Sequence, residues 1–381
     1  MCDSKEPASR FEEMYKYNGR LEHEMQAERR ERLLAEQRLA RQREVDAGRP
    51  GLVEEIEGQT DNEGETMECH QEQPPAKHKS RRTKSTFSRL YSNKVQLSEW
   101  MHERPADFEN WIVVPCPVGA RCLLVIHKMS AIAYHKGGRS ITATRTNFRH
   151  FRGTTVLDCV YTENPRHFYV LDVLIYRHLD LVHYECQFRF AWIKAKFDED
   201  NLSERFTTKP PERGGLGLSL LPTYDCAQPE SLATCWSHYP AFRNDSPRLD
   251  GFLFYHKESH YIHGLTPLVT WLFQFMLTDV LQLPSGMVNS GYLDHKPASY
   301  TGDYAKYIGD FERRRKKRKL RHRHPAKKRK TKHMSIDDAP AVEPGDHLAL
   351  WEAMEAAPLD SEDEDLRPKE LDAIRELEME G

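Results

Sequence analysis

The pattern of hydrophobic and polar positions separates a central segment of the chain from its two ends. Between residues 88 and 300, β-branched and aromatic side chains form short runs separated by glycine-containing turns, so a sizeable core can form there. Six of these runs have the length and composition of β-strands. They are Trp111–Val114, Cys122–Ile126, Val156–Tyr161, Phe168–Tyr176, Phe252–His256 and Leu268–Phe273.

The same segment predicts two helices, Tyr184–Lys196 and Pro229–His238. Strands therefore outnumber helices, and the two do not alternate along the chain. This order favours the α+β class, with a domain built on a mainly antiparallel sheet, over a parallel α/β fold.

The N-terminal end is polar, with a helical pattern over residues 20–47 and a Gly/Pro-rich linker over 51–87. The helix has only a thin apolar stripe, so it is marginal in water by itself, and we expect it to fold on a partner. A surface helix and a short coiled coil are the alternatives. The stripe consists of Met25, Leu33, Leu34, Leu39 and Val45.

The C-terminal end carries two large opposite charges side by side. Residues 313–332 contain 14 Lys/Arg in 20 positions, and residues 337–380 contain 16 Asp/Glu against 3 Lys/Arg. Neither shows a long apolar face, so we expect a disordered basic segment over 301–335 and a disordered acidic tail over 336–381. Two interpretations of the basic run stay open: a nuclear-import or nucleic-acid-binding segment, and a counter-ion for the acidic tail.

Composition agrees with one folded domain flanked by charged arms. The 381 residues include 56 Lys+Arg and 59 Asp+Glu, so a net charge of −3 hides 30% charged residues against 38% hydrophobic ones. No run of apolar residues is long enough for a membrane span, and the first residues lack the apolar core of a signal peptide, so we expect a soluble intracellular protein. Its eight cysteines form no C-x-x-C pair and are expected to be reduced thiols.

The motifs of several enzyme classes are absent. The chain has no phosphate-binding loop, no dinucleotide-binding glycine pattern and no G-x-S-x-G nucleophile motif. His256, His260 and His263 lie in a strand-and-turn context rather than on a helix, so their spacing does not predict a metal site. We therefore expect no cofactor and no metal.

Aromatic residues in the central segment suggest a nucleotide ligand. An indole stacks well on an electron-poor methylated purine, and Lys or Arg at the mouth of such a pocket would face phosphates. The tryptophans also have an ordinary explanation as core residues. The tryptophans are Trp100, Trp111, Trp192, Trp236 and Trp271, and the basic residues among them include Arg121, Lys136 and Lys257.

Four blocks of sequence resemble the snurportin family of nuclear import adaptors, which carry trimethylguanosine-capped spliceosomal ribonucleoproteins. Together they span about residues 95 to 281. The blocks are Gln96–Trp100, Trp111–Gly119, Tyr169–Val173, and Asp250–Lys257 continuing to Thr266–Leu272.

The resemblance implies a cap-binding domain over 88–300 that is similar in fold to the nucleotidyltransferase domain of mRNA capping enzymes. The segment Cys116–Gly119 aligns with the K-x-D-G motif of those enzymes, which places Cys116 where they have the lysine nucleophile. A neutral thiol cannot form the covalent intermediate that an amine provides, so the family likeness implies binding without catalysis.

The family's pocket implies roles for eight residues. Trp271 would stack on the methylated guanine, and Trp100 would contact the N2 methyl groups. Leu97 and Ser98 would lie beside the base, Cys116 and Leu171 would close the wall, and Arg121 and Lys136 would face the triphosphate or the second nucleotide. The ordinary alternative for Leu97, Cys116 and Leu171 is core packing.

The N-terminal arm, residues 1–50, resembles the importin-β-binding helix of the family, but it departs from the basic pattern. From Glu28 to Arg49 seven arginines meet five acids, which would weaken attraction to an acidic receptor groove. An importin other than importin-β is therefore the alternative. The implied receptor-binding residues are Arg29, Arg30, Arg32, Leu33, Leu34, Arg38, Arg41 and Arg43.

The resemblance thus implies a non-enzymatic adaptor that links trimethylguanosine-capped U snRNA to an import receptor and shuttles between nucleus and cytoplasm, with an export receptor for recycling among its partners. One alternative is an RNA guanylyltransferase, which needs a reactive lysine near Gly119. The other is a general RNA-binding protein that uses its basic segment, with binding steep in salt and indifferent to cap methylation.

Overall fold

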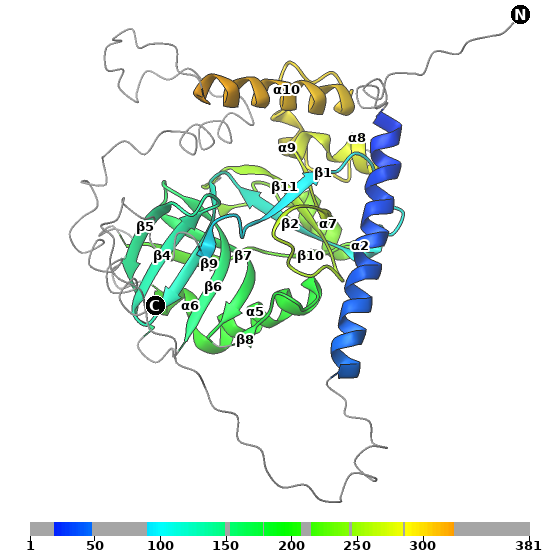
Figure 1. Ribbon diagram of the computed structural model, residues 1–381. Helices are drawn as coiled ribbons and strands as arrows, with labels where there is room; N and C mark the ends of the chain where they lie inside the picture. The colour runs from blue at the N-terminus through cyan, green and yellow to red at the C-terminus, as the bar shows by residue number, and fades with distance from the viewer. Residues whose placement is uncertain are drawn as a thin grey trace, which may run out of the picture.

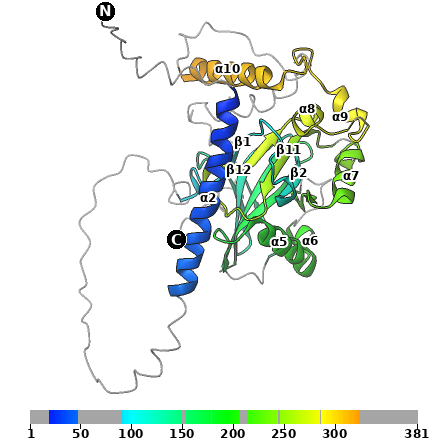
Figure 2. The ribbon, with the colours of Figure 1, turned by 90° about the vertical axis from the view of Figure 1, so that its right-hand side faces the viewer.

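A computed structural model describes residues 19–47, 90–148, 153–177, 179–206, 215–243, 246–284 and 286–323. Two β-sheets pack against each other in the body of the protein, and helices cover their outer sides (Figure 1). A long helix, α2 (Gly19–Ala47), lies along one side of this body in both ribbon views (Figure 2).

The first sheet, called sheet A, has five strands. Its pairs are antiparallel except for the parallel pair at the β1 edge. Its strand order is β1 (Gln96–Trp100), β12 (Gly264–Leu272), β11 (Leu249–His256), β2 (Trp111–Pro117) and β10 (Tyr224–Asp225).

The second sheet, sheet B, has seven strands and begins directly after a short turn that leaves sheet A. One of the seven, β9 (Gly217–Leu220), lies off the main strand order and pairs in parallel with β7. The order of the others is β5 (Ser140–Arg145), β4 (Ser130–His135), β3 (Ala120–His127), β6 (Thr154–Thr162), β7 (His167–Tyr176) and β8 (Leu179–Asp180).

Alternating side chains of the strands divide the core into layers. On the outer side of sheet A, Trp111, Val113, Phe252 and Phe254 pack against helical segments. These segments are α7 (Pro229–Ser237), the 3-10 helix η4 (Gln274–Met276), α8 (Leu277–Leu281), α9 (Ser290–Asp294) and α10 (Tyr304–Arg323). The outer side of sheet B packs against α5 (Cys186–Asp200) and α6 (Leu202–Phe206).

The sequence predictions for the central segment are confirmed. All six predicted strands occur, as β2, β3, β6, β7, β11 and β12, and the two predicted helices correspond to α5 and α7. Antiparallel pairs dominate, so the α+β class is correct. Strands β1, β4, β5, β8, β9 and β10 were not predicted, because they are short and most contain polar residues such as Ser98, Glu99 and Thr142.

One expectation about the ends is wrong. We expected 301–335 to be disordered, but Tyr304–Arg323 forms helix α10. Its first half places Tyr307 and Ile308 in the core and packs Phe311 against the same cluster, and this burial stabilises a helix whose charge would otherwise oppose it. The rest of the expected basic segment, the linker and the acidic tail lie outside the described residues.

Two ion pairs lie between the sheets, one fully buried and one with a partly exposed arginine. Arg189 of α5 and Asp172 of β7 are both fully buried and form two hydrogen bonds of 2.9 and 2.7 Å. Arg189 also donates to the carbonyl oxygen of Ser259, at 3.0 Å. Arg121 of β3 donates to both carboxylate oxygens of Asp158, at 2.5 and 2.7 Å. Full hydrogen bonding offsets the cost of burying these charges.

Replacing Arg189 with Met should destabilise the protein by about 3–5 kcal/mol, because Asp172 would be left buried without its counter-charge. The additional change Asp172→Leu should recover a large part of that loss, since it removes the unpaired charge. Urea unfolding of the two variants would measure both effects. Equal stability of the single and the double variant would contradict this account of the ion pair.

Candidate functional site

The indole of Trp271 lies close against the neighbouring strand β11. A Cβ atom built on Gly251 of β11 would lie only 2.5 Å from Cζ2 of Trp271 and 2.4 Å from the carbonyl oxygen of Leu272. No side chain fits there, so the glycine allows the ring to approach the sheet. Trp271 is partly exposed, which leaves part of its ring surface accessible.

Cys116 lies beside this ring, because it is the register partner of Gly251 on β2. Its thiol is buried, and burial, together with the nearby charge of Asp250, raises its pKa. It is therefore a neutral, apolar wall. Leu171 of sheet B belongs to the same cluster, against which Trp271 packs. The structure thus brings together three predicted site residues, Trp271, Cys116 and Leu171.

Asp250 is a feature of this site that the sequence predictions missed. It lies at a bulge, where the pairing of β11 with β2 shifts register between Leu249 and Gly251, and bulges often redirect side chains next to functional sites. Burial raises the pKa of Asp250 to about 7. Among the described residues no ion-pair partner for its carboxylate is found. The Asp-Gly pair preceding a buried aromatic strand was the available signal.

Trp100 lies on β1, the edge strand next to the strand of Trp271. It is the register partner of Trp271, and both rings contact Phe273, with centroids 5.5 Å from Trp100 and 6.2 Å from Trp271. Helix α10 covers Trp100: Phe311 packs on it edge-on at 5.5 Å, and its Nε1–H donates to Glu312 at 3.0 Å. Trp100 is therefore close to Trp271 but also holds α10.

The other predicted pocket residues do not belong to the cluster that contains Cys116, Leu171 and Trp271. Leu97 packs against a different cluster, with Tyr91 and Val95, and Ser98 follows it on β1 just before a register shift. Lys136, half-buried, follows strand β4, and its carbonyl oxygen accepts a hydrogen bond of 2.6 Å from the backbone N–H of Asn93.

Arg121 was expected to face a triphosphate, but the structure gives it an internal partner. Its Nε and Nη2 both bind the buried carboxylate of Asp158, and Nη2 also lies 3.4 Å from the Tyr255 hydroxyl. Most of its charge is thereby compensated within the core. The phosphate-facing role of Arg121 stays a prediction that this geometry disfavours.

Helix α2 carries the predicted receptor-binding residues, and several of them contact the body. Arg29 makes two hydrogen bonds to Glu99 of β1, at 2.6 and 2.8 Å, and Gln26 donates to the same carboxylate at 2.8 Å. Burial acts to raise the pKa of Glu99, but the hydrogen bonds from Arg29 and Gln26 lower it overall. Arg30 is buried, with its guanidinium 5.5 Å from the ring centre of Trp111.

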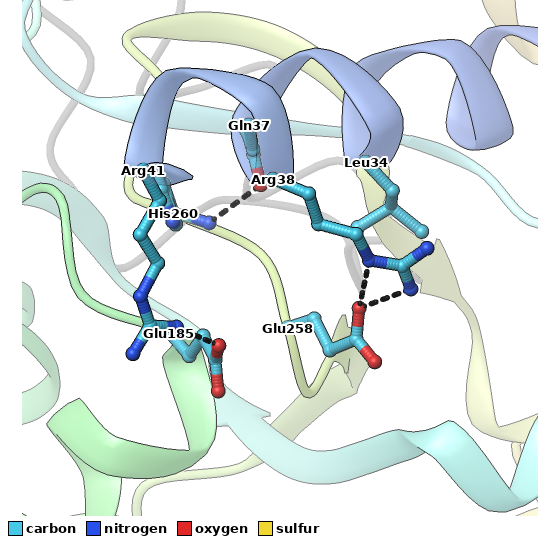
Figure 3. A pocket seen from close by; sticks show the side chains of 7 residues that line it. All are labelled: Leu34, Gln37, Arg38, Arg41, Glu185, Glu258 and His260. Atoms are coloured by element: carbon cyan, nitrogen blue, oxygen red, sulfur yellow. Dashed lines mark hydrogen bonds and ion pairs between the residues drawn. The ribbon is translucent and has the colours of Figure 1, made fainter. Parts of the chain in front are cut away.

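The C-terminal half of α2 encloses a small cavity of about 160 Å³ against the body (Figure 3). Arg38 donates to Glu258 at 2.5 Å, and Arg41 pairs with Glu185 at the start of α5. Gln37 accepts a hydrogen bond from the backbone N–H of His260. Buried Leu34 also lines this cavity. These contacts anchor the helix over about two turns.

The remaining predicted arm residues are directed elsewhere. Arg32 is exposed and lies 3.9 Å from Glu36 within the helix, while Arg43 is exposed and Leu33 is half-buried. The helix thus presents one row of arginines to the body and leaves others at the surface.

The described residues show no metal-binding cluster and no helix that could cross a membrane. Two of the three histidines have side-chain partners: His256 Nε2 lies 3.1 Å from Asp107, and His263 contacts the carbonyl oxygen of Lys94. All six described cysteines are free and buried, in agreement with the expectation of reduced thiols.

Comparison with known proteins identifies the segment that contains this site. Residues 94–273 match the family model described as Snurportin1, m3G cap-binding domain. The chain is snurportin-like over this segment. The match includes strands β1 to β12 and therefore Trp100, Cys116, Leu171 and Trp271, but it does not include α2 or α10.

Solved structures give a weaker likeness. The ligase domain of LigD from M. tuberculosis is 12% identical over 48% of this chain and 59% of its own length, with a TM-score of 0.32. A Lig E DNA ligase is 11% identical over 47% of this chain and 67% of its own, with a TM-score of 0.31. The snurportin-like chain thus spans less than two thirds of the LigD domain.

Glu99 contributes to the docking of α2 by accepting hydrogen bonds from both Arg29 and Gln26. Replacing Glu99 with Lys should weaken the docking of α2 on the body by about 1–2 kcal/mol. The loss is this small because Arg29 is partly exposed, so solvent partly screens its ion pair with Glu99. Hydrogen exchange in Gly19–Ala47 should accelerate roughly tenfold. The reversed pair Arg29→Glu with Glu99→Lys should restore slow exchange, whereas Glu36→Lys on the exposed face should leave it unchanged. Fast exchange already present in the unaltered protein would contradict the docking.

Proposed function

We propose that this snurportin-like protein binds the m3G cap of U snRNA at Trp271 and acts, without catalysis, as an adaptor for nuclear import. One observation carries the proposal: the segment that matches the m3G cap-binding domain holds a partly exposed indole laid over Gly251, beside the buried thiol of Cys116. Such a ring is a stacking platform for a purine.

The walls of the site favour a trimethylated base. Cys116 and Leu171 present apolar surface, and each methyl group on N2 of guanine adds apolar area while removing an N–H donor. A monomethylated cap would keep two N2–H donors, and a donor that is buried without an acceptor costs about 1–3 kcal/mol. Asp250 adds a carboxylate beside the site, which suits the positive charge of an N7-methylated purine.

The proposal of binding without catalysis rests on Cys116. The thiol is fully buried and its pKa is raised, so it is neutral, and it lies at the position aligned with the lysine of capping enzymes. Arg121 is held by Asp158 and cannot act as an amine nucleophile. These two features argue against the guanylyltransferase alternative.

Replacing Trp271 with Ala should weaken binding of a trimethylguanosine cap dinucleotide about 10- to 100-fold, since stacking contributes about 1–3 kcal/mol per base. Fluorescence quenching of the full chain would measure it, with the monomethylated dinucleotide as the second ligand. Trp192→Phe, a change on α5 outside the site, is the matched control. Equal binding of both caps, or unchanged binding in Trp271→Ala, would contradict the pocket.

The adaptor role requires an import receptor, and α2 is the segment we assign to it. Its arginines Arg29, Arg38 and Arg41 are engaged by Glu99, Glu258 and Glu185 of the body. A receptor with an acidic groove would compete with these carboxylates for the same side chains. Shuttling between cytoplasm and nucleus, with an export receptor for recycling, completes the proposed role.

If importin-β binds α2, the variant Glu99→Lys should bind importin-β about 5- to 20-fold more tightly than the unaltered chain does. The reason is that the body of the variant competes less well with importin-β for the helix. Surface-immobilised importin-β would measure the difference. Arg38→Glu combined with Arg41→Glu should abolish the interaction in either background. If the undocked variant shows no binding, α2 is not the importin-β site, and a different receptor must be tested.

A further inference from the structure

Helix α10 carries a dense positive charge directly beside the proposed cap site. Nine of the eleven residues from Arg313 to Arg323 are Lys or Arg, and this part of the helix spans about 15 Å at 1.5 Å per residue. The family match ends at residue 273, so it does not include this helix.

The helix is anchored rather than loosely attached. Tyr307 and Ile308 are buried in the outer core of sheet A, and the Tyr307 ring packs edge-on against Phe273 and Phe275, at 6.3 and 5.6 Å. Asp310 pairs with Arg313, and Glu312 lies 3.2 Å from Arg315. The first turns therefore fix the direction in which the basic half extends.

The anchor point is next to Trp271. Phe311 and Glu312 contact Trp100, and Trp100 is the register partner of Trp271 on the neighbouring strand. The basic run begins at Arg313, one residue after this contact. Both ribbon views place α10 across the end of the body next to β1 (Figures 1 and 2).

Three of the first basic side chains are accessible. Arg313, Arg314 and Lys317 are exposed, and the Arg313 side chain keeps 72% of its accessible surface. Arg314 lies with its guanidinium 5.9 Å from the ring centre of Tyr307. These cations can therefore meet a polyanion without disturbing the core.

From these observations we propose that α10 binds the phosphate backbone of the same RNA whose cap lies at Trp271. The inference rests on the proposed cap function and extends it: a cap is the 5′ end of a polyanion, so the following nucleotides must leave the site along the adjoining surface. A preformed, anchored cationic helix at that exit gains phosphate contacts without the ordering cost of a flexible tail.

The test compares two ligands with the full chain: a trimethylguanosine cap dinucleotide and a capped single-stranded 12-nucleotide RNA. The helix variant combines Arg313→Gln, Arg314→Gln, Lys317→Gln and Arg321→Gln, because glutamine preserves helix propensity. The matched control makes the same number of changes C-terminal to Arg323, at Lys327, Lys328, Arg329 and Lys330. Circular dichroism would verify that both variants keep their helix content.

The unaltered chain should bind the 12-nucleotide RNA at least tenfold more tightly than the dinucleotide in 50 mM salt. The helix variant should lose most of this gain but keep its dinucleotide affinity, and its salt slope should fall by about 3, since each phosphate contact on a single strand contributes about 0.7. The control variant should keep more than half of the gain.

Three results would overturn the inference. The longer RNA could bind no better than the dinucleotide, or the helix variant and its control could lose equal affinity, which would indicate undirected charge attraction. The helix variant could also keep its RNA affinity and lose only its binding to an import receptor, which would assign the helix to a protein partner. A failure of the cap dinucleotide itself to bind would instead contradict the proposed function.

Discussion

The packing of sheet A on sheet B is the constraint on which the proposed site depends. Trp271 and Cys116 belong to sheet A and Leu171 to sheet B, so the three meet only if the sheets hold a fixed separation. Between the sheets, the carboxylates of Asp172 and Asp158 are fully buried, and each accepts two hydrogen bonds from its arginine, Arg189 or Arg121. Such pairs tolerate little displacement, because a partner that moves away leaves a charge in the core.

The end of strand β1 joins the site to both charged helices. Its last two residues have different partners: Glu99 binds Arg29 of α2, and Trp100 binds Glu312 of α10. Gln26 of α2 also donates to the carbonyl oxygen of Trp100, at 3.1 Å. A ligand that moved Trp100 would therefore act on the anchors of both helices. We regard this strand as the physical link between the cap site and the arms.

The sequence allowed the central domain to be predicted well because its strands are long apolar runs, such as Phe168–Tyr176 in β7, whose burial does not depend on fine detail. Cys116, Leu171 and Trp271 became candidate site residues because the resemblance supplied them, and their common cluster joins both sheets. The Arg121–Asp158 pair could not be predicted from local patterns, since the two residues lie 37 positions apart. Asp250 was missed because its environment arises from a bulge that local patterns do not reveal.

Helix α10 shows a different limit of sequence-based prediction. Its anchor consists of Tyr307, Ile308 and Phe311, only a short apolar stripe before a long basic run. When hydropathy is averaged over a sequence window, the charged residues outweigh the apolar ones, so the segment is predicted to be solvated. The stripe becomes significant only once Phe273, Phe275 and Trp100 are known to form a surface that it can cover. Tertiary packing therefore overrides the local signal.

The most direct test of the central claim is a crystal structure of the full chain with a trimethylguanosine cap dinucleotide. The account predicts the methylated guanine stacked on the indole of Trp271, with its N2 methyl groups against apolar side chains and Cys116 at the wall of the pocket. A base bound away from Trp271, or a covalent bond between the protein and the nucleotide, would contradict it.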